Sequence, residues 1–344
     1  MDFPQFISFT LTNACNLRCR MCGQWSETGY ITNKVKDPHA KMDIADWKRL
    51  VDEITEYDIR SLLIRGGEPF LYPGVMELLE YIRSKNIFIA IDSNGMLIHK
   101  YAKDLINLGN IHITFSVDGP EEIHDAVRGV KGSFQKIKDN INLLNDMDKD
   151  QKIGKSICFT ISKYSYKGLG QMPAVARSMG IKSINIVPYY YFSEEIGKQY
   201  EKELKENFGG TAYSWKGFYD EDSDIDPYIF KEQYQAYLAD LGDIENFPFM
   251  PLSEDEYLTW FRDTITPVTP LSCTNVERLI DIQPNGECNF CIDFPDYIIG
   301  NVKDSTLKEL WNSPEAECFR AYRRKQSLAV CYRCGAKYCS EIRD

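Results

Sequence analysis

The chain of 344 residues contains no long uninterrupted run of apolar side chains. A membrane-spanning helix needs ~18 or more such residues in succession, so the sequence predicts no membrane segment. A secretory signal is missing as well, because residues 1–5 lead directly into the first expected strand. We therefore expect a cytoplasmic protein with no leader or recognition module ahead of its first domain.

Basic residues are also fewer than acidic residues. Lysine and arginine number 40 against 51 aspartates and glutamates, which gives a net charge of −11. Nucleic-acid binding requires a basic surface, so we expect no nucleic-acid partner. The hydrophobic content of 43% and charged content of 26% are those of a soluble globular protein. The length suits a main domain with an appendage.

Cysteine, in contrast, is plentiful, with eleven residues. In a chain that is not exported, cysteines indicate metal binding rather than disulfides. Cys15, Cys19 and Cys22 follow an apolar strand at 6–12 with the spacing C-x3-C-x2-C. A structural zinc ion or an iron–sulfur cluster normally takes four protein ligands, so three thiols imply a cluster with one iron left open. Three unrelated cysteines or a partial zinc site are the alternatives.

Small polar turns follow the next three expected strands. Gly66, Gly67 and Glu68 come after strand 60–65, Ser93 and Asn94 after strand 87–92, and residues 116–119 at the end of strand 112–117. Ligands meet backbone N–H groups at the C-terminal ends of parallel strands, so these turns are candidate binding loops. Any one of them alone would be an ordinary turn between a strand and a helix.

With the cysteine spacing, this order of turns resembles the radical S-adenosylmethionine (radical SAM) superfamily over roughly residues 5–190. The resemblance implies that Cys15, Cys19 and Cys22 hold a catalytic 4Fe–4S cluster whose open iron chelates SAM. It assigns Gly66, Gly67 and Glu68 to the methionyl amine of SAM. Ser93 and Asn94 are assigned to the wall of the SAM pocket.

The same resemblance assigns residues further along the chain. Ser116 and Asp118, at the end of the fourth strand, are expected near the ribose and carboxylate of SAM. Arg128, in the stretch 124–129, is expected to pair with the carboxylate. Met21 and Val187 are expected to flank the adenine, although core packing is an alternative for both.

Strands and amphipathic helices alternate through the first half of the chain, and such repeats predict parallel strands with right-handed crossovers. A full eight-stranded barrel would need two further units, which the pattern does not show. The resemblance implies a partial (β/α)6 TIM-like barrel, open on one side. The expected strands are 6–12, 60–65, 87–92, 112–117, 156–162 and 183–188. The expected helices lie near 43–56, 73–84, 99–108, 133–147 and 171–179.

Three domains are expected: the barrel at 1–190, an insertion at 191–265 that shapes the substrate pocket, and a cysteine-rich domain at 266–344. In the insertion, a helical segment reaches about Phe208 and an acidic loop follows at 220–226. A calcium loop is ruled out, because Ile225 stands where the turn glycine is needed and Lys231 where glutamate is needed. We expect a solvated loop, with local core roles for the nearby aromatic residues Trp215, Phe218, Tyr219, Trp260 and Phe261.

Seven further cysteines lie near the C-terminus: 273, 288, 291, 318, 331, 334 and 339. Two C-x2-C pairs would suit a zinc ribbon. Their arrangement around Pro284, Asn285 and Gly286 instead resembles the α+β SPASM/twitch extension of some radical SAM enzymes, with a hairpin over 279–292 and a helix at 307–311. The shorter twitch pattern implies one auxiliary 4Fe–4S cluster.

The expected ligands of the auxiliary cluster are Cys273, Cys291, Cys331 and Cys334. The spacing leaves open whether Cys288 or Cys339 replaces one of them. Cys158 and Cys318 are expected to be ordinary buried cysteines.

These motifs predict a radical SAM oxidoreductase that uses the auxiliary cluster as electron acceptor in a two-electron oxidation of a small polar molecule. Peptide maturation, by thioether or carbon–carbon linkage or by epimerisation, is the alternative. A scaffold or carrier of iron–sulfur units would be expected to have damaged SAM turns, and these turns are intact. A flavodoxin- or ferredoxin-like protein is the expected electron donor. The oligomeric state stays open.

Overall fold

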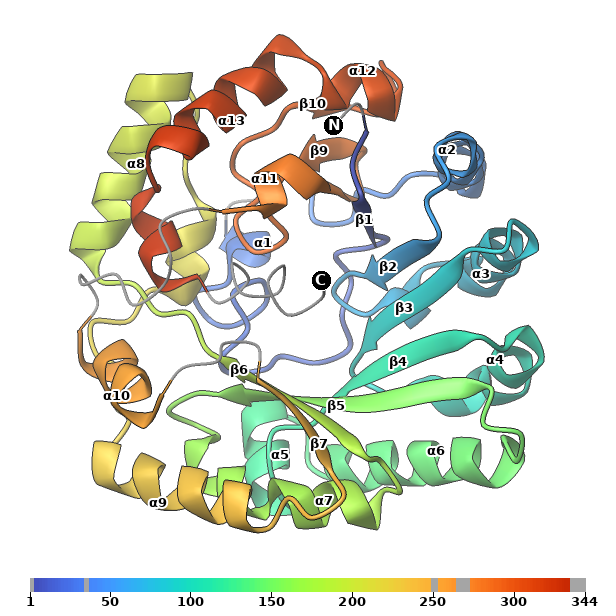
Figure 1. The fold of residues 1–344 in the computed structure, drawn as a ribbon, viewed down its shortest axis with the longest axis vertical. Helices are drawn as coiled ribbons and strands as arrows, with labels where there is room; N and C mark the ends of the chain where they lie inside the picture. Colours follow the sequence, from blue (N-terminus) through green and yellow to red (C-terminus); the bar gives the residue numbers. More distant parts are fainter. Residues whose placement is uncertain (1–2, 34–36, 249–252, 264–272, 335–344) are drawn as a thin grey trace.

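Ten strands form one mixed sheet in the computed structural model of this chain (Figure 1). The structure describes residues 3–33, 37–248, 253–263 and 273–334. The strand order is β10-β9-β8-β1-β2-β3-β4-β5-β6-β7. The strands are β1 Phe6–Thr10, β2 Ser61–Arg65, β3 Phe88–Ser93, β4 Ile111–Ser116, β5 Ile153–Ile161, β6 Ser183–Pro188, β7 Glu245–Pro248, β8 Leu279–Ile282, β9 Glu287–Asn289 and β10 Gly300–Asn301.

Strands β1 to β6 are parallel and lie in chain order. Helices lie along the outer side of this curved sheet (Figure 1): α2 Ile44–Glu56, α3 Val75–Ser84, α4 Ala102–Leu108 and α6 Ser133–Met147. Helix α2 buries Trp47, Leu50, Val51 and Ile54, the stripe with helical spacing that packs a helix onto a sheet. The predicted partial barrel with a C-terminal cysteine-rich appendage is confirmed.

Two more parallel strands extend this sheet, contrary to the expectation that no further unit exists. Strand β7 pairs with β6, and β8 pairs with β1. The four-residue β7 is too short to give a periodic signal, and the sequence predicts β8 only as one strand of a C-terminal hairpin. That hairpin is present, because β8 and β9 are antiparallel and Gly286 turns with a φ of 91°. All three expected domains therefore contribute strands to one sheet.

The remaining helices gather mainly around the open side of the sheet and its ends: α1 Tyr30–Asn33, α5 Glu121–Arg128, α7 Met172–Ser178, α8 Glu194–Phe208, α9 Pro227–Ala239, α10 Glu254–Arg262, α11 Asn275–Arg278, α12 Leu307–Trp311 and α13 Pro314–Lys325. Short 3-10 helices lie at Pro69–Leu71, Ile98–Lys100, Tyr166–Gln171, Ser214–Phe218 and Ala329–Arg333. The sequence did not predict the helices α5, α9 and α10. None of the helices in the described ranges has both the length and the apolar character of a membrane span.

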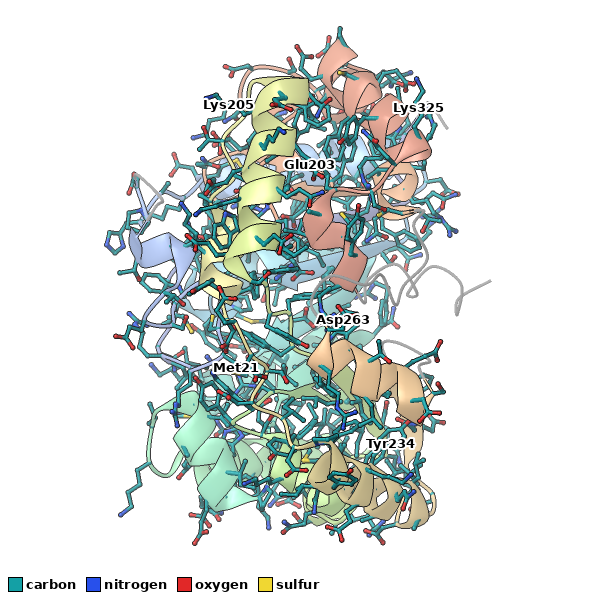
Figure 2. The ribbon with its side chains drawn as sticks, turned by 90° about the vertical axis from the view of Figure 1, so that its left-hand side faces the viewer. Met21, Glu203, Lys205, Tyr234, Asp263 and Lys325 are labelled. Carbon is teal, nitrogen blue, oxygen red and sulfur yellow. The ribbon has the colours of Figure 1, made fainter. Side chains whose placement is uncertain are left out.

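The insertion and the C-terminal segment pack against each other. Figures 1 and 2 both show α8 beside α13. The carboxylate of Glu203 on α8 accepts a hydrogen bond of 2.8 Å from the backbone N–H of Ala329, which begins the 3-10 helix that carries Cys331. The insertion therefore supports the second cysteine-rich region as well as the mouth of the barrel.

Candidate active site

The loop between β1 and α1 brings Cys15, Cys19 and Cys22 together. The thiols of Cys15 and Cys22 lie close enough to Cys19 to act on its charge, and burial raises the pKa of Cys19 to about 11. In the described ranges, no group of three His, Cys, Asp or Glu side chains is placed to hold a single metal ion. Three thiols at this wider spacing suit a cluster, in which each thiolate binds a different iron and one iron has no protein ligand.

Apolar packing and backbone contacts hold this loop in shape. Leu17, Cys19 and Met21 are buried against Val127 of α5. The N–H of Arg20 donates to the carbonyl of Val127 at 2.9 Å. Met21, the expected adenine neighbour, therefore lies within the cysteine loop and contributes to its small apolar core.

Gly66 and Gly67 let the loop after β2 approach the backbone just before Cys15. A Cβ atom on Gly66 would lie 2.5 Å from the carbonyl oxygen of Thr12, and one on Gly67 would lie 2.5 Å from that of Ala14. The N–H of Gly67 donates to Thr12 at 2.7 Å, and the N–H of Glu68 donates to Ala14 at 2.8 Å. No larger residue fits without moving backbone, so both glycines are required by close approach.

Glu68 joins the ends of β2 and β3. Its carboxylate accepts hydrogen bonds from the Ser93 hydroxyl at 2.9 Å and from the backbone N–H groups of Asn94 and Phe70 at 2.8 and 3.2 Å. Burial raises the pKa of Glu68 to about 7, although these three donors favour the charged form. The sequence did not suggest this linking role. Contact between this carboxylate and the amine of SAM stays a prediction.

Asn94 continues from that link toward the cysteines. Its Nδ2 donates to the side-chain oxygen of Asn16 at 2.8 Å and lies 3.9 Å from the sulfur of Cys15. Its own Oδ1 accepts from the N–H of Met96 at 3.0 Å. The structure thus brings Ser93 and Asn94 to the edge of the cysteine loop, where a ligand of the cluster would lie.

Asp118 and Arg128 form a buried ion pair. Arg128 Nη2 lies 2.6 Å from Asp118 Oδ2, and Arg128 Nη1 points at the sulfur of Cys19 at 3.6 Å. Asp118 also accepts a hydrogen bond of 3.2 Å from the N–H of Thr160. The resemblance gave these two residues separate contacts with SAM, whereas the structure pairs them. Arg128 Nε is buried with no partner in the described residues, so one donor stays available.

Ser116 and Val187 lie at neighbouring strand ends. Ser116 is half-buried at the end of β4, in register with Cys158 of β5. Val187 is half-buried on β6, in register with the same Thr160 that bonds Asp118. The structure places both on the rim that carries the cysteine loop, and their roles toward SAM stay predictions.

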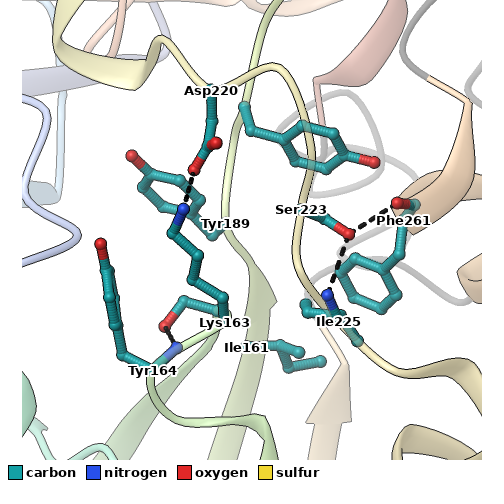
Figure 3. Close-up of a pocket in the computed structure, with 10 residues that line it drawn as sticks. Ile161, Lys163, Tyr164, Tyr189, Asp220, Ser223, Ile225 and Phe261 are labelled. Carbon is teal, nitrogen blue, oxygen red and sulfur yellow. Dashed lines mark hydrogen bonds and ion pairs between the residues drawn. The ribbon is translucent and has the colours of Figure 1, made fainter.

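A small pocket lies beside this rim, with Lys163 at its centre (Figure 3). Lys163 follows β5, and its ammonium lies 2.7 Å from Asp220 and 3.1 Å from Asp224 of the insertion. Tyr164 and Tyr189 line the pocket and also pack against the apolar cluster that contains Met21. The pocket is therefore next to the cysteine loop, and sequence reasoning missed Lys163 although it directly follows an expected strand.

The acidic loop is only partly solvated, contrary to expectation. Asp222 is exposed, but Ser223 and Ile225 are buried and line the pocket. The Ser223 hydroxyl donates to the carbonyl of Phe261 at 2.6 Å (Figure 3). Exposed and buried positions therefore alternate along the loop, and the buried Ser223 and Ile225 anchor it. Of the aromatic residues expected in local core, Trp215, Trp260 and Phe261 are buried, whereas Tyr219 is exposed.

The second cysteine group lies between β9 and the C-terminal 3-10 helix. The thiols of Cys331 and Cys334 lie near that of Cys291, and the buried guanidinium of Arg323 lies near Cys331, Cys334 and Cys273. The structure thus gathers the four expected ligands around one place. Four thiols match the protein ligands of a cubane cluster.

Cys288 lies apart from this group. It is fully buried on β9, and the residues that influence its ionisation include Asp281, Glu53 and Glu287 but no cysteine of the group. Cys339, the other possible substitute, lies outside the described residues. Cys158 is half-buried, and desolvation raises its pKa to about 12, whereas Cys318 is exposed, contrary to expectation.

Arg333 connects this group to the pocket. It lies between Cys331 and Cys334 in the sequence, is fully buried, and its guanidinium stacks between the rings of Tyr191 and Trp260 at 4.6 and 4.5 Å. It donates to the Tyr191 hydroxyl at 3.0 Å and to the backbone carbonyl of Asp263. The residue Asp263 is labelled in Figure 2. Tyr191 also lines the pocket, so one side chain borders both regions.

Comparisons with known proteins agree with this geometry. Residues 9–166 match the model of the radical SAM superfamily, and residues 273–335 match that of the SPASM iron–sulfur cluster-binding domain. The chain is 24% identical over 322 residues to the antilisterial bacteriocin subtilosin biosynthesis protein AlbA of Bacillus subtilis, with 90% of this chain and 60% of that protein covered. It is 27% identical over 191 residues to the Fe-coproporphyrin III synthase of Methanosarcina barkeri, covering 55% of this chain and 44% of the synthase. The chain thus spans about half the length of these relatives.

Solved structures show the same fold. Streptococcus suis SuiB bound to the precursor peptide SuiA aligns with a TM-score of 0.65 at 16% identity, over 100% of this chain and 74% of SuiB. Native anSMEcpe with bound AdoMet aligns with a TM-score of 0.58 at 18% identity, over 90% of this chain and 82% of that one. At these identities the likeness establishes the architecture alone.

Proposed function

We propose that this chain, a radical SAM protein with a C-terminal SPASM domain, catalyses the two-electron oxidation of a small polar substrate. When bound, SAM and the cluster at the three-cysteine loop supply a 5′-deoxyadenosyl radical, which can take hydrogen from an unactivated carbon. The observation that carries the proposal is the presence of two separate cysteine groups, each linked to the Lys163 pocket through a tyrosine that lines it. A single group would suffice for a reaction without net oxidation.

The chain's own residues position SAM and the first cluster. Cys15, Cys19 and Cys22 supply three thiolates and leave one iron free. Gly67 lets the loop after β2 pack against the backbone just before Cys15, and its neighbour Glu68 ties that loop to the end of β3. Arg128 offers its unpartnered Nε as a donor to a carboxylate, while Asp118 fixes the orientation of its guanidinium.

The pocket residues orient the substrate and exclude water. Tyr164 and Tyr189 separate Lys163 from the cysteine loop, and Ser223 closes the opposite side. A substrate that carries hydroxyl or amino groups can bond the phenol hydroxyls and the ion pair of Lys163 with Asp220. Holding the target carbon in one place favours hydrogen removal at one position, and a dry pocket suppresses side reactions.

The second cysteine group gives the electron from the substrate a destination. The proposed ligands are Cys273, Cys291, Cys331 and Cys334, and Arg333 fixes the last two against the pocket wall. We assign catalysis to residues 1–190, substrate enclosure to 191–265 and electron acceptance to 266–344. A flavodoxin- or ferredoxin-like partner in the cytoplasm would recycle the electron.

A second candidate function is maturation of a ribosomal peptide. The similarity to a bacteriocin biosynthesis protein over 90% of this chain favours it, as do the relatives SkfB, a sporulation killing factor maturation protein, and PqqA peptide cyclase. The small size of the pocket and the ion pairs of Lys163 with Asp220 and Asp224 favour a small polar molecule instead.

The test is an anaerobic turnover assay on reconstituted protein with SAM and a reductant. Aminocyclitol-like alcohols and short peptides are offered in parallel, and products are read by mass spectrometry. The proposal expects a small-molecule product lighter by two hydrogens and one SAM consumed per product. A cross-linked or epimerised peptide, with no oxidised small molecule, would favour the second candidate.

A further inference from the structure

Arg323 on α13 places a buried positive charge against the second cysteine group. Only 3% of its surface is exposed. Its guanidinium contacts the Cys273 thiol and lies near those of Cys331 and Cys334. Nη1 donates to the carbonyl of Gln326 at 2.7 Å, whereas Nη2 is buried with no hydrogen-bond partner of normal geometry in the described residues. A buried, unsatisfied donor beside three thiols points to an anionic group that the thiols would hold.

The charge of Arg323 also lacks a carboxylate to balance it. Within the described ranges, no ion pair joins it to aspartate or glutamate. Its neighbours on the helix differ, because Arg324 pairs with Glu277 and Glu317 at 2.7 Å. At the first cysteine group, the corresponding buried arginine, Arg128, is neutralised by Asp118.

The carboxylates around the second group have partners of their own. Asp293 lies near Cys291 but also near the Arg65 guanidinium, and it accepts a hydrogen bond from Tyr190. Asp296 accepts hydrogen bonds from Tyr200 and from the backbone of Tyr213. Among the residues that the structure describes, the uncompensated charge next to the thiols is therefore that of Arg323.

We propose that Arg323 is a positioning residue that raises the reduction potential of the auxiliary cluster and so makes it an electron acceptor. Reduction adds one negative charge to the cluster, and a fixed positive charge in a low-dielectric site stabilises that state. With a cluster bound at these thiols, the substrate radical would lose one electron to the cluster, which would be reduced by one electron, and one proton to solvent. This inference rests on the proposed function of the second cysteine group as the electron acceptor.

The test is a potentiometric titration of the auxiliary cluster, followed by electron paramagnetic resonance. The full chain with Cys15, Cys19 and Cys22 changed to alanine isolates that cluster. Arg323→Gln in this background is expected to lower the midpoint potential. The ratio of reduced to oxidised cluster at a fixed potential falls by about tenfold or more, equivalent to about 59 mV for one electron.

Two matched variants separate charge from structure. Arg323→Lys keeps the charge and is expected to hold the potential close to that of the parent. Arg324→Gln removes an exposed charge one residue away and is expected to leave the potential unchanged. An Arg323→Gln protein that keeps its four irons and titrates like the parent would overturn the inference, while the cluster assignment would stand.

If Arg323→Gln loses its iron, a further variant tests whether the charge of Arg323 raises the reduction potential. Gln326→Glu keeps Arg323 and places a carboxylate on the residue whose carbonyl Arg323 already binds, on an exposed side chain that tolerates change. A lower potential supports the inference, and an unchanged potential overturns it. A parent chain without any iron after removal of the first three cysteines would instead refute the proposed function.

Discussion

The two cysteine-rich regions of this molecule hold similar side chains in different electrostatic settings. At the first, three thiols face an arginine that Asp118 neutralises at 2.6 Å. At the second, Arg323 lies near three thiols, those of Cys273, Cys331 and Cys334, and has no such carboxylate among the described residues. Two sites with similar ligands can therefore serve opposite directions of electron flow, because the nearby charge shifts the potential of each.

The two regions also differ in how they are attached to the fold. The first sits in a loop that backbone hydrogen bonds and glycine contacts join to the barrel strands. The second is held by side chains, above all Arg333 between Tyr191 and Trp260. The first should tolerate loss of any single side-chain contact better than the second.

The largest expected effect comes from removing the first ligand set. Changing Cys15, Cys19 and Cys22 together to alanine should abolish SAM cleavage and reduce the iron content from about eight to about four per chain. Anaerobic iron analysis and a 5′-deoxyadenosine assay measure both. More than a trace of residual SAM cleavage would show that the radical is generated elsewhere. That result would contradict the different roles assigned to the two cysteine groups.

Removing one ligand of the second set should leave cleavage intact and stop oxidation. Cys334→Ala is expected to produce 5′-deoxyadenosine with at least a tenfold loss of oxidised product, because the substrate electron has no acceptor. Circular dichroism controls for unfolding, since metal ligands also stabilise small domains. A folded variant that lacks four irons but turns over like the parent would contradict the role of the second cluster as electron acceptor. A redox-neutral reaction would then be the remaining explanation.

Arg128→Ala tests the neutralised arginine. We expect SAM affinity to weaken by about 1.5–3 kcal/mol, roughly 10- to 160-fold, the range for a hydrogen bond to a charged group. Equilibrium binding to the reconstituted protein measures the effect, with iron content as the control for cluster retention. Unchanged affinity would mean that the pair with Asp118 is purely structural.

Arg333→Lys tests the attachment of the second region. Lysine cannot stack between two rings and donate to both acceptors, so the variant should lose about 1–3 kcal/mol of stability. Thermal unfolding of the metal-loaded protein measures the loss, with Arg324→Lys as the exposed control on α13. Equal unfolding temperatures for the two variants would contradict the idea that Arg333 fixes the cysteine pair.

The smallest expected effect on metal content comes from Cys288→Ala. This thiol lies on β9 away from the other cysteines, so the iron count should stay at about eight. A cost of about 1–2 kcal/mol in stability is expected from the lost packing of a small buried side chain. Loss of about four irons would show that Cys288 replaces one of the four proposed ligands.

Much of the barrel was predictable because its signals are local. Six strands alternate with amphipathic helices, and the turn residues Gly66 and Gly67 follow a strand directly. The strand β7 was missed because four residues give no period, and the place of β8 was missed because its pairing with β1 joins residues far apart in the sequence. Long-range pairing of this kind has no local sequence signature.

The candidate site divides in the same way. The cysteine loop follows from its spacing, and the turns expected to bind SAM follow from the family resemblance. The pairing of Asp118 with Arg128 instead depends on how α5 packs against the cysteine loop. Lys163 could have been suspected from its position after β5, but its aspartate partners come from a loop expected to be solvated. Arg323 carries no motif, and only its burial among thiols makes it notable.

Electron paramagnetic resonance of the reduced, reconstituted chain with and without SAM tests the two-site account most directly. The account predicts two distinct cluster signals, of which SAM alters one, and that one disappears when Cys15, Cys19 and Cys22 are changed to alanine. The other signal should persist in that variant and ignore SAM. A single signal together with stoichiometric zinc would contradict the account.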